Sequence, residues 1–185
     1  MILWEDTRQQ RGKHEVKHAW WTAHNVEFAE RAVALKDGDY TRDGSNVIID
    51  TKRDIRELAS NVTRDHKRVR KDYADAKERG WQLVILVENL DGVTSLATLP
   101  KWVNDYCKSC NHFKSVRCNP SAAGECKRTR RKMKKPIQGE RLAKICVTME
   151  KRYGVKFMFC TPQESARIIC DLLEIPYSDG DAPCL

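Results

Sequence analysis

The feature that most constrains the fold is an unbroken apolar segment from Leu83 to Val87. A strand without polar alternation has to be covered on both faces, as the central strands of α/β sheets are. A second apolar strand is predicted over Val155–Cys160, and helical patterns precede and follow both segments. This alternation predicts an α/β fold in which helices flank a mixed central sheet.

Capping and turn signals predict where the surrounding elements begin and end. Asp54 with Glu57 forms a capping box that starts a helical pattern, which resumes at Val69 and stops at Gly80. The segment Thr161–Glu164 combines an N-cap, a proline and a glutamate in the order typical of a helix start. The other predicted elements are strands over Ile2–Asp6, Val26–Leu35 and Val47–Ile49 and a helix over Leu142–Tyr153.

The composition is that of a globular chain, with 41% hydrophobic and 32% charged residues among 185. This length suits one domain with room for a small insert. No apolar run approaches the roughly 18–20 residues that a membrane helix needs, and the segment Met1–Asp6 lacks the pattern of a signal peptide. We therefore expect an intracellular protein, in the cytoplasm of a prokaryote or of a phage-infected cell rather than in a nucleus.

Positive charge is concentrated in one stretch of the chain. The net charge is +8 and the pI about 9.1, and such an excess favours a polyanionic partner. Nine basic residues lie in this stretch against a single acid, Glu125: Lys114, Arg117, Lys127, Arg128, Arg130, Arg131, Lys132, Lys134 and Lys135. We expect the last seven to contact nucleic acid, although such a run is also compatible with ordinary solvated surface.

Two carboxylates are predicted to meet across a β-hairpin. Asp43–Asn46 is a turn signal, and if these four residues form the loop, Asp39 lies directly opposite Asp50. The two Cβ atoms would then be about 4.5–5.5 Å apart on one face of the sheet. Lys52 follows Asp50 by two residues, so its side chain points to the same face.

This trio is chemically suited to cleaving a phosphodiester. Two like charges in direct contact destabilise a hairpin unless a cation compensates them, and Mg²⁺ or Mn²⁺ prefers such oxygen ligands. The ammonium of Lys52 can orient a water molecule or stabilise charge that develops on phosphate. The alternative is a surface hairpin whose acids pair with Arg42 or Arg53.

Several segments together resemble the XPF/Hef-type nuclease domain, a branch of the PD-(D/E)XK superfamily. The matching segments, in chain order, are Asp6-Thr7-Arg8-Gln9, Gly38-Asp39-Tyr40, Asp50-Thr51-Lys52, the apolar strand Leu83–Glu88, and Arg141–Leu173. The resemblance covers nearly the whole chain except residues 90–136. It implies a restriction-endonuclease-like sheet and a metal-dependent, structure-selective DNA endonuclease that acts on branched or flapped DNA.

The resemblance also implies roles for single residues. Asp39 and Asp50 would hold Mg²⁺ or Mn²⁺, Lys52 would serve catalysis, and Asp6 and Arg8 would support the site. It further implies a homodimer, for which the surface around Val155–Cys160 and Thr161–Leu173 is the candidate, with Ile168 and Leu172 as apolar contacts.

This chain departs from the family pattern at four positions. Thr51 stands where the family has arginine, and Asp50 stands in place of glutamate. Gln9 replaces an acid, and Arg56 occupies the position of another acid. These changes leave room for a different substrate. The alternative to an enzyme is a non-catalytic, zinc-containing protein that binds nucleic acid and keeps the nuclease-like fold.

Four of the eight cysteines are clustered in the sequence, at Cys107, Cys110, Cys118 and Cys126. Their segment has little apolar content, so a structural Zn²⁺ ion is predicted to order it. His112 could replace one of these cysteines as a ligand. The alternatives to zinc are unpaired thiols in a disordered loop and a redox-active pair of Cys107 and Cys110. The resulting division is a nuclease domain over residues 1–89 and 137–176, a Cys-rich basic insert over 90–136, and an acidic tail over 177–185.

The remaining cysteines and the histidines carry less information. Cys146, Cys160 and Cys170 occupy apolar positions and are predicted to lie in the core. The irregular spacing of His14 and His18 near the N-terminus favours surface positions over metal ligation.

Overall fold

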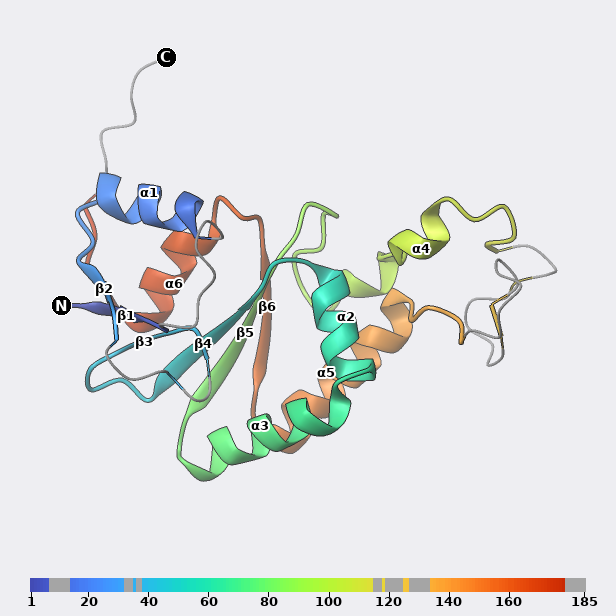
Figure 1. Ribbon diagram of the computed structural model, residues 1–185, viewed down its shortest axis with the longest axis horizontal. Helices are drawn as coiled ribbons and strands as arrows, with labels where there is room; N and C mark the ends of the chain where they lie inside the picture. The colour runs from blue at the N-terminus through green and yellow to red at the C-terminus, as the bar shows by residue number, and fades with distance from the viewer. Residues whose placement is uncertain are drawn as a thin grey trace, which may run out of the picture.

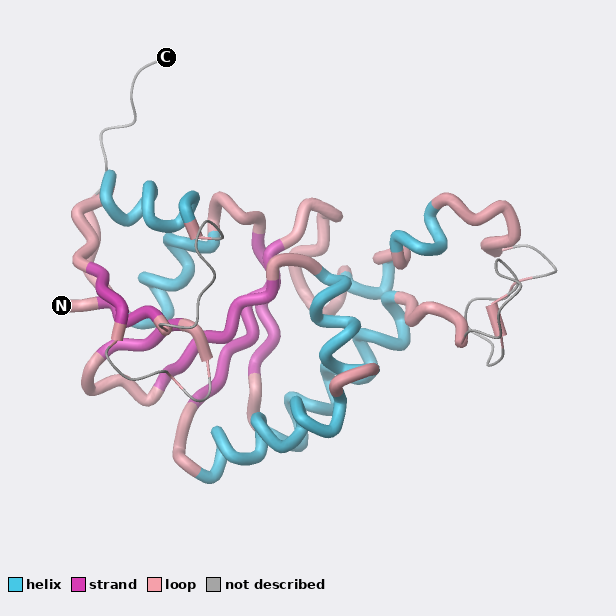
Figure 2. The backbone as a smooth tube through the Cα atoms, in the orientation of Figure 1, coloured by secondary structure: helices cyan, strands magenta, loops and turns pink. Residues whose placement is uncertain are grey.

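The computed structural model describes residues 1–6, 14–31, 35, 38–114, 118, 125–126 and 134–178. The elements are β1 (Leu3–Glu5), α1 (Glu15–Ala23), β2 (Phe28–Glu30), β3 (Tyr40–Arg42), β4 (Val47–Lys52), α2 (Ile55–Thr63), α3 (His66–Glu78), β5 (Gln82–Glu88), the 3-10 turn η1 (Leu99–Lys101), α4 (Asp105–Lys108), α5 (Gly139–Tyr153), β6 (Lys156–Cys160) and α6 (Ser165–Leu173). Figure 1 shows the strands in the middle, with α1 and α6 to their left and α2, α3 and α5 to their right, and Figure 2 separates helices from strands by colour.

The sheet is mixed, which confirms the predicted fold class. Its strand order is β2-β1-β3-β4-β5-β6. β3 is antiparallel to both β1 and β4, whereas β5 runs parallel to its two neighbours. The apolar segment that forms β5 thus lies inside the sheet, as its lack of alternation predicts.

Helices cover both faces of this sheet. Ile48 and Ile85 pack with α2, α3 and α5 in one apolar cluster, and Ile49 and Val84 pack with α1 and α6 in another. The side chains of a strand alternate between the two faces, so neighbouring residues supply different cores. The ends of β4, β5 and β6 consequently lie at one edge, with a helical layer on each side.

Most predicted boundaries agree with the structure. Asp54 caps α2 by accepting a hydrogen bond from the Glu57 backbone N–H at 2.7 Å. The single helical stretch that follows is divided into α2 and α3. Gly80 and Gly154 have φ of 78° and 73°, and both lie where a helix ends. The strand predicted over Val26–Leu35 is shorter, since β2 spans three residues and residues 32–34 lie outside the described part.

The histidine-rich segment near the N-terminus was not predicted as a helix, yet it forms α1. Trp21 is fully buried and donates a hydrogen bond to the Ala166 carbonyl at 3.1 Å, which joins α1 to α6. His14 is 8% exposed and lies 2.6 Å from the Tyr40 hydroxyl. The prediction of a surface position for His14 was therefore wrong, because aromatic packing draws the helix onto the sheet.

The segment after β5 begins in the core. Leu99 and Trp102 belong to the apolar cluster that also contains α5, and a Cβ on Gly139 would lie 2.1 Å from the Leu99 carbonyl oxygen. Contacts with η1 therefore require glycine at the start of α5. Cys146, Cys160 and Cys170 are buried in the two clusters, as predicted. Among the described residues, no helix has both the length and the apolar character needed to cross a lipid bilayer.

Candidate active site

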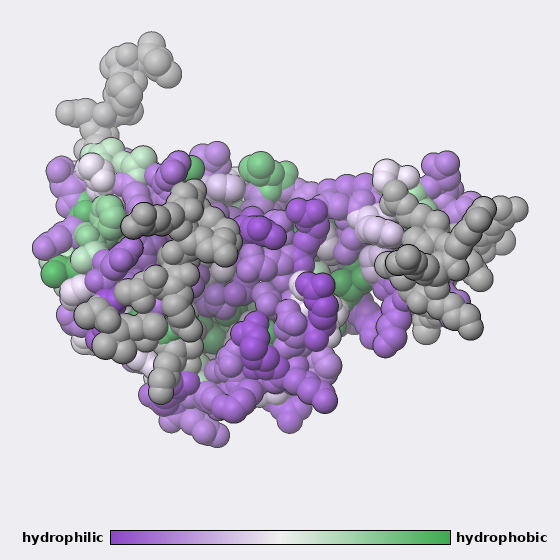
Figure 3. Space-filling view, viewed as in Figure 1, coloured by the Kyte–Doolittle hydropathy of each residue, from purple (hydrophilic) through white to green (hydrophobic). Residues whose placement is uncertain are grey.

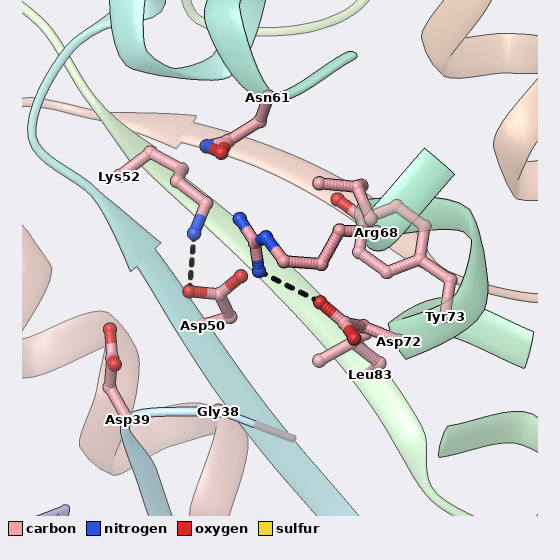
Figure 4. A pocket seen from close by; sticks show the side chains of 10 residues that line it. Gly38, Asp39, Asp50, Lys52, Asn61, Arg68, Asp72, Tyr73 and Leu83 are labelled. Carbon is pink, nitrogen blue, oxygen red and sulfur yellow. Dashed lines mark hydrogen bonds and ion pairs between the residues drawn. The ribbon is translucent and has the colours of Figure 1, made fainter. Parts of the chain in front are cut away.

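A pocket of about 170 Å³ lies between β4 and the helices α2 and α3. Figure 4 shows its side chains converging from the sheet and from both helices. The lining residues are Gly38, Asp39, Asp50, Lys52, Asn61, Arg68, Val69, Asp72, Tyr73 and Leu83. The surface over α2 and α3 is hydrophilic (Figure 3), so the pocket opens into a polar region. Asp39, Asp50 and Lys52, selected from the sequence, are thus brought to one pocket.

The hairpin that carries Asp39 follows the predicted register and then slips by one residue. Tyr40 pairs with Ile49, as the four-residue loop requires. The Asp39 N–H, however, donates to the carbonyl of that same Ile49 at 2.7 Å. Gly38 permits this approach, because a Cβ there would lie 2.7 Å from the Ile49 carbonyl oxygen. Asp39 is therefore displaced from the position directly opposite Asp50.

The displaced carboxylate is held by Thr51. Oδ2 of Asp39 accepts hydrogen bonds from the Thr51 N–H at 2.8 Å and from its hydroxyl at 2.5 Å. Thr51 occupies the position where the resembled family has arginine. The Thr51 hydroxyl, which an arginine would lack, thus helps to fix the orientation of this carboxylate.

Asp50 and Lys52 form the charged centre of the pocket. Lys52 Nζ donates to Asp50 Oδ1 at 2.5 Å, and the two side chains are 12% and 22% exposed. Burial raises the pKa of Asp50 to about 6, while Lys52 lowers it and Asp39 raises it. Burial opposes the charge of Lys52, but Asp50 outweighs this effect and raises the pKa of the ammonium. Asp39 is a second carboxylate in this pocket, and no cation is paired with it within the described part of the chain.

The alternative of a surface hairpin with acids paired to arginine does not match these contacts. Arg42 donates to Glu174 at 2.8 Å. Arg53 lies 3.9 Å from Asp54 and 3.7 Å from Glu57. Both arginines thus have partners outside the pocket, and neither neutralises the two pocket carboxylates.

Two pocket residues were missed by the sequence analysis, Asn61 on α2 and Arg68 on α3. Asn61 is 9% exposed, and Figure 4 shows its amide turned toward Lys52 and Asp50. No hydrogen bond to that amide is found within the described part of the chain. Arg68 extends from α3 toward the same space and is held by Asp72 at 2.9 Å. Asn61 is a polar residue on the otherwise apolar face of α2, whereas Arg68 lies on the exposed, charged side of α3 and gave no such signal.

Asp6 lies behind the pocket instead of lining it. It is 3% exposed, its N–H donates to the Asp39 carbonyl at 2.8 Å, and its Oδ1 accepts from the Leu35 N–H at 3.2 Å. These bonds tie the end of β1 to the segment that positions Asp39. Arg8, the other predicted supporting residue, lies outside the described residues.

The pocket supplies oxygen ligands without forming a complete metal site. Within the described ranges, no group of three or more His, Cys, Asp or Glu side chains is placed to hold a metal ion. Hydrogen bonds engage Oδ2 of Asp39 and Oδ1 of Asp50, which leaves one oxygen of each carboxylate for a cation. Mg²⁺ takes such hard oxygen donors and commonly keeps several waters. The donor type at the pocket therefore suits Mg²⁺, while the described residues do not form a complete ligand set.

A second charged group lies on the opposite face of the sheet, beneath α1. Lys17 Nζ is 2.5 Å from Glu88 Oε1, and the two side chains are 5% and 11% exposed. Glu5 lies 2.8 Å from the His18 ring and accepts from the Tyr40 hydroxyl at 3.3 Å. Burial, followed by the charge of Glu5, raises the pKa of Tyr40 far above its usual value. Each carboxylate here has a fixed partner within the fold.

The predicted nucleic-acid contacts are described only in part. Lys134 is exposed and pairs by backbone with Glu125 in an isolated bridge, and Lys135 is half-buried. Five other predicted contacts lie outside the described residues: Lys127, Arg128, Arg130, Arg131 and Lys132.

Comparison with solved structures identifies the fold. The chain is similar to XPF from Aeropyrum pernix with a TM-score of 0.55 and 15% sequence identity, over 94% of this chain and 64% of that chain. No protein-family model matches the sequence, and no curated protein matches it. At this identity the likeness shows the fold alone, and the match spans less than two thirds of the XPF chain. The chain therefore has an XPF-nuclease-like fold, and Asp39, Asp50 and Lys52 converge within it.

Proposed function

We propose that this chain is a Mg²⁺- or Mn²⁺-dependent DNA endonuclease that hydrolyses phosphodiester bonds in branched or flapped DNA. The observation that carries the proposal is the single pocket that contains Asp39, Asp50 and Lys52 together with Asn61 and Arg68. The carboxylates of Asp39 and Asp50 suit a metal ion, and the ammonium of Lys52 and the guanidinium of Arg68 are complementary to a phosphate. The XPF-like fold supports the same conclusion.

Each side chain has a role in this proposal. Asp39 and Asp50 would hold the metal ion, whose contribution when bound would be Lewis-acid stabilisation of charge on the phosphate. Lys52, held by Asp50 at 2.5 Å, orients the attacking water or stabilises negative charge that develops on the phosphate. Thr51 keeps Asp39 in place, and Arg68 and Asn61 contact the oxygens of the phosphate from the helical side.

Substrate preference would come from the shape of the DNA. The basic residues between Lys114 and Lys135 would contact the phosphates of DNA of any sequence. They would therefore supply salt-sensitive affinity without recognition of the bases. A junction or flap is bent already and can reach both this stretch and the pocket. A linear duplex has to bend smoothly, which costs on the order of 1–6 kcal/mol. We expect linear duplex to be cut about 10-fold or more slowly.

A homodimer is the proposed assembly, through the surface around β6 and α6. Ile168 and Leu172 are partly buried against the apolar cluster beneath α6, so only part of each side chain is available to a partner. Light scattering at micromolar concentration tests this proposal. A monomer across that range would reject it.

The decisive experiment is single-turnover cleavage of labelled flap DNA with and without Mg²⁺. Asp50→Asn and Asp39→Asn should each lower the rate by about 10²-fold or more, because each removes a ligand of the ion that stabilises the transition state. DNA binding should stay near that of the wild type, since the basic stretch is unchanged. Asp43→Asn is the matched control, because Asp43 lies in the same hairpin with a 73% exposed side chain that points to Arg31. It should cleave at the wild-type rate.

The same experiment separates the enzyme from a non-catalytic protein of the same fold. DNA binding without Mg²⁺-dependent cleavage in any member of a panel of linear, flapped and branched substrates would favour the non-catalytic alternative. Equal rates for the wild type and Asp50→Asn would show that this pocket is not the active site.

A further inference from the structure

The four clustered cysteines lie in one part of the molecule, outside both apolar cores. Cys107 lies in α4, and the Cys110 N–H donates to its carbonyl at 3.1 Å, so a tight turn joins the first two. Cys107, Cys118 and Cys126 are 7%, 8% and 8% exposed, yet none of them belongs to either apolar cluster. Burial raises the pKa of the Cys107 thiol, a hydrogen bond from Gln138 lowers it, and the nearby thiols of Cys126, Cys110 and Cys118 raise it. These four thiols thus share one neighbourhood.

The core cysteines provide an internal contrast. Cys146 and Cys170 are 0% exposed and pack among aliphatic and aromatic side chains. Burial of such thiols is explained by apolar packing alone. The segment that carries the four clustered cysteines has few large apolar residues, so packing does not explain why three of them are buried. All four are free thiols, without a disulfide among them.

Contacts at the base of the segment hold one of these thiols in a specific orientation. Gln138, at the start of α5, donates from Nε2 to the sulfur of Cys107 at 3.3 Å. Its Oε1 accepts from the Asn104 N–H at 3.1 Å, so one side chain joins the two ends of the segment. An N–H donor that points at a sulfur stabilises the thiolate form, which is the form that binds metal.

Two ion pairs fasten α4 to the nuclease-like core. Arg56 of α2 lies 3.3 Å from Asp105, and Lys108 lies 2.7 Å from Asp91. At the other side, the bridge between Glu125 and Lys134 closes the chain next to Cys126. Ion pairs therefore hold the start of the cysteine segment against the core, and Gln138 joins that start to the end of the segment.

We propose that Cys107, Cys110, Cys118 and Cys126 bind one structural Zn²⁺ ion and that this ion orders the segment between Asn104 and Gln138. No metal-ready group of three or more His, Cys, Asp or Glu exists among the described residues, so binding has to draw the four sulfurs together. Each thiol releases its proton as it ligates, and four thiolates on Zn²⁺ leave a net charge of −2. The basic residues that follow Cys126 in the sequence offset this charge. The proposal is independent of the nuclease function.

The first test is the metal content of the full chain purified without chelator. We expect about one zinc per chain, a tetrahedral site being the usual structural form. Titration of the reduced, metal-free protein with Co²⁺ should give the visible and thiolate charge-transfer bands of a tetrahedral sulfur site. This measurement requires no variant. Absence of zinc together with absence of these bands would overturn the proposal.

Variants then test which cysteines are ligands. Cys118→Ser and Cys126→Ser should each lose most of the zinc, whereas Cys184→Ser, a cysteine far from the cluster in sequence, should retain it. Wild-type zinc content in Cys118→Ser would reject this ligand set.

Alkylation separates zinc from the redox alternative. Removal of the metal from the folded protein should expose four additional thiols to iodoacetamide, all of which zinc protects. Cys146, Cys160 and Cys170 should stay unmodified in either state, because burial raises the pKa of each to about 12. A disulfide between Cys107 and Cys110 in the protein as isolated, without zinc, would assign the pair to redox chemistry and reject the zinc site.

Discussion

The two faces of the sheet bury charge in opposite ways. Beneath α1, Lys17 and Glu88 neutralise each other at 2.5 Å, with both side chains almost inaccessible. On the α2–α3 face, Asp39 and Asp50 share one lysine in an open pocket, and burial raises the pKa of Asp50 to about 6. The charge of Glu88 is thus offset by a cation within the fold. The α2–α3 face instead places two carboxylates beside a pocket, which makes this face the candidate for ligand binding.

The largest expected effect concerns the Lys17–Glu88 ion pair beneath α1. Lys17→Met leaves Glu88 buried without its cation, and removal of one partner from a buried pair costs about 3–5 kcal/mol. Lys17→Met/Glu88→Gln should recover much of this loss, since neither charge then remains. Chemical denaturation of the wild type and both variants measures the difference. A stability loss below about 1 kcal/mol, as for an exposed pair, would show that this face does not depend on the ion pair.

An intermediate effect on stability is expected when Mg²⁺ binds at the pocket on the α2–α3 face. A ligand at 100 times its Kd stabilises the native state by about 2.7 kcal/mol. For a chain of this size that corresponds to roughly 2–4 °C for each kcal/mol, so the midpoint of thermal unfolding should rise by several degrees. Asp50→Asn should abolish the rise, whereas Lys17→Met should keep it. An equal rise in Asp50→Asn would place the metal elsewhere.

The smallest expected effect concerns Arg68 at the pocket mouth. Arg68→Ala should lower kcat/KM by about 10-fold, in the range of a partly exposed hydrogen bond to a charged group. Arg70→Ala is the matched control, because Arg70 is an exposed arginine of the same helix that does not line the pocket. Equal effects of the two substitutions would show that Arg68 has no specific role at the pocket.

Local patterns predicted most of the fold. The apolar segment of β5, the capping box at Asp54 and the glycine at residue 154 lie where the structure has them. Helix α1 was missed because its residues owe their helical state to contacts of Trp21 with α6, which are distant in sequence. Tertiary packing of this kind leaves no periodic signal strong enough to identify the element.

The candidate pocket was predictable to a different extent. The length of the turn was enough to predict that Asp39 and Asp50 share one face of the hairpin, because the loop determines the hairpin register. The slip at Gly38 and the hydrogen bonds from Thr51 depend on a close backbone approach that spacing cannot reveal. Asn61 and Arg68 come from two helices, and only the tertiary arrangement shows that they face Lys52.

The most direct test of the central claim is a metal-switch measurement at the phosphate that is cut. Flap DNA carrying a single phosphorothioate at the mapped cleavage position is compared with normal DNA under single-turnover conditions, in Mg²⁺ and in Mn²⁺. We predict that one phosphorothioate isomer slows Mg²⁺-dependent cleavage by about 10²-fold, that Mn²⁺ restores the rate, and that Asp50→Asn is inactive with either ion. Cleavage that is indifferent to the sulfur and to the choice of ion, or that persists in Asp50→Asn, would contradict a metal-dependent site at Asp39, Asp50 and Lys52.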